Sequence, residues 1–378
     1  MAIGRRPPLD WLLACIPLAG LMTVLAPASQ TAIFICACLA IIPLASWLGR
    51  ATEQLARHTG EGIGGLLNAT FGNAAELIIA LMAMRSGLDD VVKASLTGSI
   101  IGNILLVLGG SFLAGGMRHK TQHFNAAAGR TYATMLYLAA IALVVPAIVH
   151  TLAGARASTL DQPLSLGIAL VLILTYLLSL WFSLHTHAEL FTGPPAQCAA
   201  DAAGAAGAGA SDSSAPWSLS HSLATLAVAT GLVVWMSEIL VATVEPAASR
   251  MGWNNVFIGV VVVAIIGNAA EHATALRVAR SNRMDLAIGI ALGSSIQIAL
   301  FVAPVLVFLS YAIAPHPLDL VFSPEEVLAV VVAVMVASQV CNDGESHWLE
   351  GVQLLSVYLI LAVVFYLLPE PARSLHPP

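Results

Sequence analysis

The pentapeptide Gly-Asn-Ala-Ala-Glu occurs twice in this chain of 378 residues, first as Gly72 to Glu76 and again as Gly267 to Glu271. Each copy lies inside a stretch that is apolar enough to cross a lipid bilayer. A carboxylate at that depth is costly, and such groups are usually kept for function. Two carboxylates at matching depths therefore indicate a path for a cation or a proton.

The pentapeptide is part of a longer repeat with a constant offset of 195 residues, the distance from Glu76 to Glu271. The same offset pairs residues on both sides of it: Ile63 with Ile258, Gly64 with Gly259, Ala69 with Ala264, Arg85 with Arg280, Gly98 with Gly293 and Ser99 with Ser294. An internal duplication is the economical explanation.

Composition places the chain in a membrane. Hydrophobic residues make up 58% of it and charged residues 10%, and the mean hydropathy is +0.87. Soluble domains carry about 25% charged residues. The net charge of −6 is spread over short loops without a basic block, so no nucleic-acid partner is expected. The five cysteines show no metal-ligand spacing and are expected to pack as small apolar groups.

Eleven apolar runs are candidates for membrane-spanning helices, since about 30 Å of hydrocarbon needs about 20 helical residues. They lie near residues 10 to 26, 31 to 48, 62 to 85, 91 to 114, 131 to 150, 163 to 184, 219 to 242, 255 to 279, 285 to 313, 325 to 340 and 348 to 368. The first run follows two arginines, as in a signal peptide, but no convincing cleavage site precedes the second run. We therefore expect the first run to be retained as a helix.

The offset assigns these runs to two repeats. It maps the second run onto the seventh, the third onto the eighth, the fourth onto the ninth and the fifth onto the tenth. The sixth run then pairs with the eleventh. Five spans per repeat is an odd number, so the second repeat enters the membrane upside down relative to the first. The predicted fold is an all-α integral membrane protein with one extra N-terminal helix and two inverted five-helix repeats. Inverted repeats are typical of transporters that bind their substrate at the bilayer midplane.

The predicted organisation follows from these runs. It has an N-terminal helix (1–28), a first repeat (29–186), a flexible cytoplasmic linker rich in Ala, Gly and Ser (187–217), a second repeat (218–369) and a tail (370–378). With the N-terminus inside, ten basic residues fall on the cytoplasmic side and five outside, which favours a cytoplasmic N-terminus. We expect a bacterial inner membrane, and the sequence leaves homo-oligomerisation open.

The polar residues of the repeats suggest a cation site. Asn73 and Glu76 share one face of a helix, as do Asn268 and Glu271. Carboxylate and amide oxygens suit Ca²⁺, which takes six to eight oxygen ligands. The following helix of each repeat adds further polar positions: Ser99 and Asn103 in the first, and Ser294, Ser295 and Gln297 in the second. A serine in a membrane helix often bonds only its own backbone, but the matched pair Ser99 and Ser294 favours a role at the site.

Histidines give weaker signals. His272 follows Glu271, whereas its counterpart in the first repeat is Leu77. It is a candidate for modulating proton transfer, with a hydrogen bond to a neighbouring helix as the simpler interpretation. His185, His187 and Glu189 could suggest zinc, but a solvated helix end is the better explanation because no further ligand is suitably spaced.

The two motifs resemble those of a known family. The stretch Leu67-Asn68-Ala69-Thr70-Phe71-Gly72-Asn73-Ala74-Ala75-Glu76, with Lys93-Ala94-Ser95-Leu96 and Gly98-Ser99 after it, is similar to the first signature of the Ca²⁺/H⁺ antiporters, the CAX branch of the Ca²⁺/cation antiporters. Gly267 to His272, Asn282 to Leu286 and Gly293 to Val302 resemble the second signature. The Na⁺/Ca²⁺ exchanger branch typically reads Gly-Thr-Ser-x-Pro-Glu at the first motif, so this chain resembles the proton-coupled branch.

The resemblance implies eleven helices and the export of Ca²⁺ in exchange for protons, with no cofactor. It also implies that Glu76 and Glu271 are essential and that Asn73, Asn268, Ser99, Ser294 and Gln297 support them. The linker departs from the family, in which it is strongly acidic. Here it holds only Glu189, Asp201 and Asp212, which speaks against a Ca²⁺-sensing role.

Proton coupling has a simple physical basis. A low-dielectric site favours a neutral carboxyl, whereas a divalent ion favours an ionised one, so protons and Ca²⁺ are expected to compete for Glu76 and Glu271. Three alternatives stay open: a Na⁺-coupled or broad-specificity cation exchanger, an intramembrane metalloenzyme and a passive channel. Oxygen ligands alone do not fix the ion, but an enzyme would need nitrogen or sulfur ligands that the sequence does not supply beyond His272.

Overall fold

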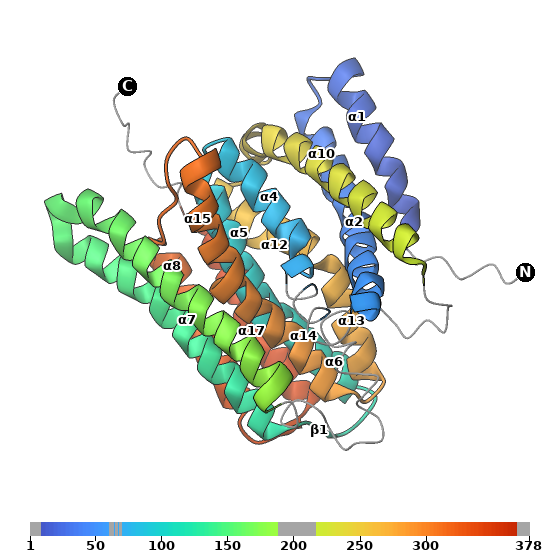
Figure 1. Ribbon diagram of the computed structural model, residues 1–378, viewed down its shortest axis with the longest axis vertical. Helices are drawn as coiled ribbons and strands as arrows, with labels where there is room; N and C mark the ends of the chain where they lie inside the picture. The colour runs from blue at the N-terminus through green and yellow to red at the C-terminus, as the bar shows by residue number, and fades with distance from the viewer. Residues whose placement is uncertain (1–8, 60–63, 65–66, 68–69, 188–216, 369–378) are drawn as a thin grey trace, which may run out of the picture.

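The computed structural model describes residues 9–59, 64, 67, 70–187 and 217–368, and in these ranges the chain is almost entirely helical. Residues 188–216 of the predicted linker and the C-terminal tail therefore lie outside the described residues, as do residues 1–8 and positions 62, 63, 65, 66, 68 and 69 at the start of the predicted third span. Figure 1 shows the helices packed lengthwise into a bundle, with α1, α2 and α10 together on one side and the α7–α8 pair on the other.

The first half of the chain forms helices that break at short irregular turns. Its elements are η1 (Asp10–Ala14), α1 (Cys15–Leu25), α2 (Gln30–Thr59), α4 (Ala74–Arg85), α5 (Asp89–Ile101), η2 (Gly102–Val107), α6 (Leu108–Gly116), β1 (Gln122–His123), α7 (Ala126–Ala153), η3 (Gly154–Arg156), α8 (Ala157–Trp181) and η4 (Phe182–Thr186). Asn125 begins α7 because its side chain accepts hydrogen bonds from two free amides of the first turn. α5, η2 and α6 form one continuous helical run.

The second half repeats much of this pattern. Its elements are α10 (Leu219–Met251), α11 (Asn255–Phe257), η6 (Ile258–Val263), α12 (Ala264–Gly267), α13 (Ala269–Arg280), α14 (Met284–Gln297), η7 (Ile298–Val302), α15 (Ala303–Ile313), α16 (Pro324–Val340), β2 (Glu345–Ser346) and α17 (Trp348–Leu367). Ser323 and Glu326 form a capping box that fixes the start of α16. β1 and β2 pair antiparallel, with Gln122 opposite Ser346.

Six of the described helices are long and apolar enough to cross a membrane, or seven if the bent pair Asn255–Gly267 and Ala269–Arg280 counts as one span. One of the six is the run Ala126–Thr186, which folds back on itself as the α7–α8 hairpin in Figure 1. Helices α1 and α16 are shorter than a full span. The chain is thus a helical membrane protein, and the count of eleven spans stays a prediction.

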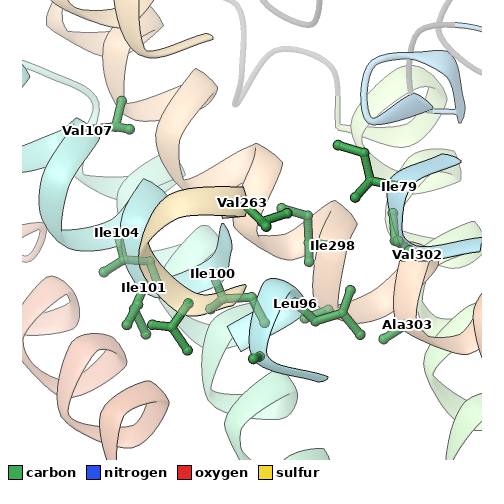
Figure 2. Packing of buried hydrophobic residues seen from close by; sticks show 14 of the residues in the cluster. Ile79, Leu96, Ile100, Ile101, Ile104, Val107, Val263, Ile298, Val302 and Ala303 are labelled. Carbon is green, nitrogen blue, oxygen red and sulfur yellow. The ribbon is translucent and has the colours of Figure 1, made fainter. Parts of the chain in front are cut away.

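The centre of the bundle is the α5–η2–α6 run. Within the most apolar stretch of 18 residues in this run, 89% is buried inside the protein. The corresponding share is 22% for the α7–α8 hairpin and for α17. The hairpin exposes apolar side chains such as Ile141, Val145 and Leu174, as expected of a surface in contact with lipid. Figure 2 shows the middle of the core, where Leu96, Ile100 and Ile104 of the central run pack against the second half.

Small residues let the central run approach its neighbours closely. A Cβ added at Gly98 would lie 2.1 Å from the carbonyl oxygen of Val260, and one at Gly259 would lie 2.5 Å from the Cβ of Ala94. α5 and η6 are therefore in contact backbone to backbone, as glycines allow in membrane helices. This contact ties the first repeat to the second beside the two copies of the pentapeptide.

Candidate functional site

The two glutamates of the repeated pentapeptide occupy matching places in the fold. Glu76 lies in the first turn of α4 and Glu271 in the first turn of α13. Each helix is preceded by a break at the asparagine of the motif, and at Asn268 the chain bends by 60° between α12 and α13. Each glutamate thus lies in the first turn of a helix, where backbone amides have no partner within the helix.

The asparagine of each repeat bonds the serine of the other. The Nδ2 of Asn268 donates to the Oγ of Ser99 at 3.1 Å. In the related pair, the Oγ of Ser294 donates to the Oδ1 of Asn73 at 3.2 Å. All four side chains are buried, with exposures of 5% or less. The sequence-predicted residues of the two halves therefore meet at one place.

Two further amides join this group without a counterpart in the other repeat. The Nδ2 of Asn103 lies 3.0 Å from the Oγ of Ser294 and 3.3 Å from the Oδ1 of Asn268. The side-chain oxygen of Gln297 accepts a hydrogen bond from Asn73. Asn103 was expected as a polar position of the first repeat but was not among the predicted ligands. Its repeat equivalent is Ile298, so the symmetry that found the other residues could not find this one.

The serine that follows Ser294 does not belong to the group. The hydroxyl of Ser295 bonds the carbonyl oxygens of Ala291, at 3.0 Å, and Ile100, at 3.2 Å. This is the self-bonding that membrane serines commonly show. The two adjacent serines thus have different environments, which their sequence does not reveal.

Each of the two carboxylates has a buried oxygen atom that accepts no hydrogen bond from the described residues. In the part of the chain that the structure describes, the Oε2 atoms of Glu76 and Glu271 are buried and lack a hydrogen-bond partner. The two groups are near enough for their charges to repel each other, and Ser294 also bonds Glu271. Buried carboxylates of this kind are stabilised either by a cation or by a proton.

A small cavity adjoins Glu76. It has a volume of about 10 Å³, room for about one water molecule, and Glu76, Ser99 and Gly267 are among its lining residues. A Cβ added at Gly267 would lie 3.3 Å from the Oε1 of Glu76, so the glycine makes room for the carboxylate. The arrangement offers a cation hard oxygen ligands from carboxylates, amides and hydroxyls, the set that Ca²⁺ prefers.

Helix irregularities coincide with the site. η2 and η7 are π-helical and fall at equivalent positions of the two repeats. Asn103 lies within η2, and Gln297 directly precedes η7. A π-helical turn holds one extra residue and often marks a functional site. The sequence gives no sign of these turns.

The remaining candidates contribute less. His272 is half-buried next to Glu271. Among the described residues there is no cluster of three or more His, Cys, Asp or Glu side chains that could hold a metal, and Glu189 of the weak zinc alternative lies outside them. Cys38 and Cys341 are buried free thiols, and burial raises the pKa of Cys341, between α16 and α17, to about 12.

The chain is similar to proteins of known type over most of its length. The family described as "Sodium/calcium exchanger protein" matches it twice, at residues 29–185 and 221–367. A "Ca(2+)/H(+) antiporter" of Synechocystis is 46% identical, over 90% of this chain and 92% of that protein. The "Ca(2+)/H(+) antiporter ChaA" of Bacillus subtilis is 45% identical, over 88% of this chain and 91% of that protein.

Solved structures match as well. The structure of native YfkE is 40% identical and superposes with a TM-score of 0.80, covering 95% of this chain and all of the other. An H⁺/Ca²⁺ exchanger named CAX is only 14% identical but still superposes with a TM-score of 0.67, over 95% of this chain and 91% of the other. The second likeness concerns the fold alone.

Proposed function

Because the chain belongs to the sodium/calcium exchanger family, and within it resembles the Ca²⁺/H⁺ antiporters, we propose that it moves Ca²⁺ across a membrane in exchange for H⁺. It is a transporter and not an enzyme. The likeness to antiporters along about nine tenths of the chain supports the choice of ions.

The proposed Ca²⁺ site consists of Glu76 and Glu271, with Asn73, Asn268, Ser99, Ser294 and Gln297 as supporting ligands. The observation that carries it is the pair of reciprocal bonds in which each repeat's asparagine meets the other's serine. Two half-sites with the same residue types, facing each other, suit one shared cation. Asn103 is added to the proposed set because it bonds both Asn268 and Ser294.

Exchange follows from competition for the two carboxylates. With Ca²⁺ bound, both glutamates are ionised and the site is neutral; without it, two protons make the site neutral again. A neutral site can cross between the two sides at the lowest cost in a low-dielectric path. Alternating access on this scheme exchanges about two protons per Ca²⁺, the number that neutralises two carboxylates.

The membrane arrangement of the proposal keeps the sequence predictions. It has eleven helices in two inverted five-helix repeats after an N-terminal helix, with the N-terminus in the cytoplasm of a bacterial cell. The two separate matches to one family model, one for each half, support the repeat. His272 would modulate proton transfer at Glu271.

The decisive experiment is Ca²⁺ uptake into proteoliposomes driven by an imposed proton gradient. We expect uptake by the wild type and its loss in Glu76→Gln and in Glu271→Gln. Glu345→Gln is the matched control, because Glu345 lies at the surface in β2, and it should transport normally. Uptake that persists in both glutamine variants would refute the two-carboxylate site.

The alternative is a Na⁺-coupled or broad-specificity cation exchanger. The same vesicles test it when a Na⁺ gradient replaces the proton gradient. Uptake driven by Na⁺ and indifferent to pH would replace the proton-coupled proposal. Competition by Mn²⁺ under a proton gradient would instead widen the substrate range, since oxygen ligands bind both ions.

A further inference from the structure

A second hollow, of about 430 Å³, lies at the surface where two of the membrane-spanning helices end. We call it the Lys120 pocket. It is lined by Gly116, Met117, Lys120 and Trp348. One candidate span, Asp89–Gly116, ends at the pocket and another, Trp348–Leu367, begins there. The pocket therefore lies at the level where the hydrocarbon of the bilayer meets its headgroups.

The contact between α6 and α17 shapes the pocket. A Cβ added at Gly116 would lie 2.5 Å from the amide nitrogen of Trp348, so the glycine lets the start of α17 pack against the end of α6. The Nδ1 of His347 lies 3.4 Å from the carbonyl oxygen of Lys120 and 3.4 Å from the Oγ1 of Thr121. The backbone that carries Lys120 is thus held beside α17.

The pocket combines a cation with exposed apolar side chains. Met117 is 75% exposed, and Trp348 and its neighbour Leu349 are each 51% exposed. Tryptophan is enriched where a membrane meets water, because its ring is apolar and its N–H is polar. A lysine at this level keeps its ammonium among the headgroups while its methylene groups lie along apolar surface. This combination suits an amphipathic ligand.

Further cations lie beside the pocket. The Nε2 of His119 lies 3.3 Å from the carbonyl oxygen of Arg280, which brings the end of α13 next to the end of α6. Figure 1 shows α6, α13 and β1 at the same end of the bundle. Four exposed basic residues in these segments form no ion pair with another described residue: Arg118, Lys120, Arg277 and Arg280.

The carboxylates of the adjoining segments are engaged with other partners. Backbone amides donate hydrogen bonds of 2.6 to 3.1 Å to Asp285, Asp343 and Glu350. Glu345 lies 3.6 Å from the Nδ1 of His123. No carboxylate of the described residues therefore pairs with Lys120, and its ammonium is available to an anionic group from outside the chain.

We propose that the Lys120 pocket binds an anionic phospholipid from the leaflet at this end of the molecule. The phosphate of the headgroup contacts the ammonium of Lys120, and the upper part of an acyl chain packs against Met117 and Trp348. Basic pockets between spanning helices favour anionic headgroups, and Arg118 and Arg280 add to the positive potential. The bound lipid bridges the ends of α6 and α17. The proposal does not depend on which ions the protein transports.

The test uses the purified full-length protein in micelles that contain equal amounts of dioleoylphosphatidylglycerol and dioleoylphosphatidylcholine. Native mass spectrometry identifies the lipids that stay bound, and a titration gives the apparent Kd for phosphatidylglycerol. We expect the wild type to prefer phosphatidylglycerol. Lys120→Gln should weaken its binding roughly fivefold, the factor equivalent to the about 1 kcal/mol that one lysine contributes near anionic lipids.

Two further variants examine the parts of the pocket separately. Lys120→Arg keeps the positive charge and should preserve the preference for phosphatidylglycerol. Trp348→Ala keeps the backbone and the Cβ that contact Gly116 but removes the indole, so it should weaken the binding of both lipids. Arg130→Gln is the matched control, because Arg130 is another exposed cation at this end, in α7, and does not line the pocket. It should bind phosphatidylglycerol as the wild type does.

Three results would overturn the proposal. The first is equal retention of the two lipids by the wild type. The second is an equal effect of Lys120→Gln and Arg130→Gln, since that would reflect net charge and not the pocket. The third is competition by sn-glycerol 3-phosphate, which has the phosphate but no acyl chains, at the same concentration as the lipid. All these measurements are made without Ca²⁺ and without a proton gradient, so a failure of the proposed function would leave them unaffected.

Discussion

At the scale of single residues, the carboxylate of Glu76 is positioned by the absence of a side chain at Gly267. The glycine ends α12, and a methyl group added to it would lie 3.3 Å from the Oε1 of Glu76. That distance is shorter than ordinary van der Waals contact, so the carboxylate would have to shift by a few tenths of an ångström. Oxygen ligands of Ca²⁺ are held at about 2.3 to 2.6 Å, and displacement of one of them weakens binding.

We therefore expect Gly267→Ala to raise the KM for Ca²⁺ by roughly tenfold, equivalent to about 1.4 kcal/mol. The measurement is initial uptake into proteoliposomes over a range of Ca²⁺ concentrations. Gly293→Ala is the matched control, because nothing lies within 4 Å of a Cβ added there. An unchanged KM for Gly267→Ala would mean that Glu76 has room to move without loss of affinity.

Symmetry decides which residues of this group can be predicted from sequence. Asn73, Asn268, Ser99 and Ser294 were predicted because each has an equivalent at the fixed offset, and the structure brings them together. Their function stays a prediction. Asn103 was left out of the set because its equivalent is Ile298. Asymmetric contacts depend on how the helices pack against each other. The spacing of residues within one repeat does not predict that packing.

At the scale of elements, Lys93 of α5 binds the segment between α15 and α16. The Nζ of Lys93 lies 2.6 Å from the Oδ1 of Asp319 and 2.8 Å from the carbonyl oxygen of Val321. The side chains of Lys93 and Asp319 are 14% and 31% exposed. Gln162 and Ser165 of α8 bond the same segment from the other side. The pairing joins positions 226 residues apart, which is why the sequence could not predict it.

Lys93→Met should lower the stability of the folded protein, because it leaves the carboxylate of Asp319 without its charged partner. Hydrogen bonds to charged groups contribute about 1.5–3 kcal/mol, and partial exposure places the expected loss at the lower end. The readout is thermal unfolding in detergent.

Arg130→Met is the control for this measurement. Arg130 is exposed, and its guanidinium donates a hydrogen bond of 3.3 Å to the carbonyl oxygen of Ala126 in its own helix. Substitutions at such surface positions change stability by about 0.5 kcal/mol or less. Equal losses of stability in the two variants would show that the contact of Lys93 with the segment does not stabilise the fold. In the double variant Lys93→Met, Asp319→Asn, the loss should be smaller than the sum of the single losses.

At the scale of the whole molecule, the proposed site lies between two halves that no single helix connects. Figure 1 shows α4 and α5 of the first half interleaved with α12, α13 and α14 of the second. In the proposed site, a cation bound between them would hold the halves together. Any ligand that binds only the folded state stabilises it, by about 2.7 kcal/mol when its concentration is a hundred times the Kd.

Ca²⁺ should accordingly raise the unfolding temperature, and the effect should shrink as the pH falls. Protons occupy the same carboxylates at low pH, so less Ca²⁺ binds and the stabilisation declines; at higher pH it is fully present. Thermal unfolding with and without Ca²⁺ at a series of pH values checks this. Glu271→Gln should abolish the shift at every pH. A shift that is independent of pH would argue against a shared site for the two ions.

The overall architecture was predictable to the extent that it depends on hydrophobicity and repetition. Long apolar runs predict helices, and most predicted runs coincide with helices of the structure. The length of an apolar run alone does not identify a span. Helices α1 and α16 are shorter than a full span, and the chain bends at Asn268 within another predicted run. The strand pair β1–β2 was not predicted because it joins segments that are distant in the sequence. The π-helical turns were not predicted because an apolar run shows the same pattern with or without them.

The backbone contact between α5 and η6 has a consequence for the history of the chain. If the two halves descend from one ancestor, Gly98 and Gly293 began as the same residue. Today a methyl group at Gly98 would collide with Val260, whereas at Gly293 it would meet open space. Divergence has thus made one copy of an inherited glycine indispensable for packing and released the other from that constraint. In orthologues of this protein, drift at position 293 should be tolerated by packing, while position 98 should be held by purifying selection.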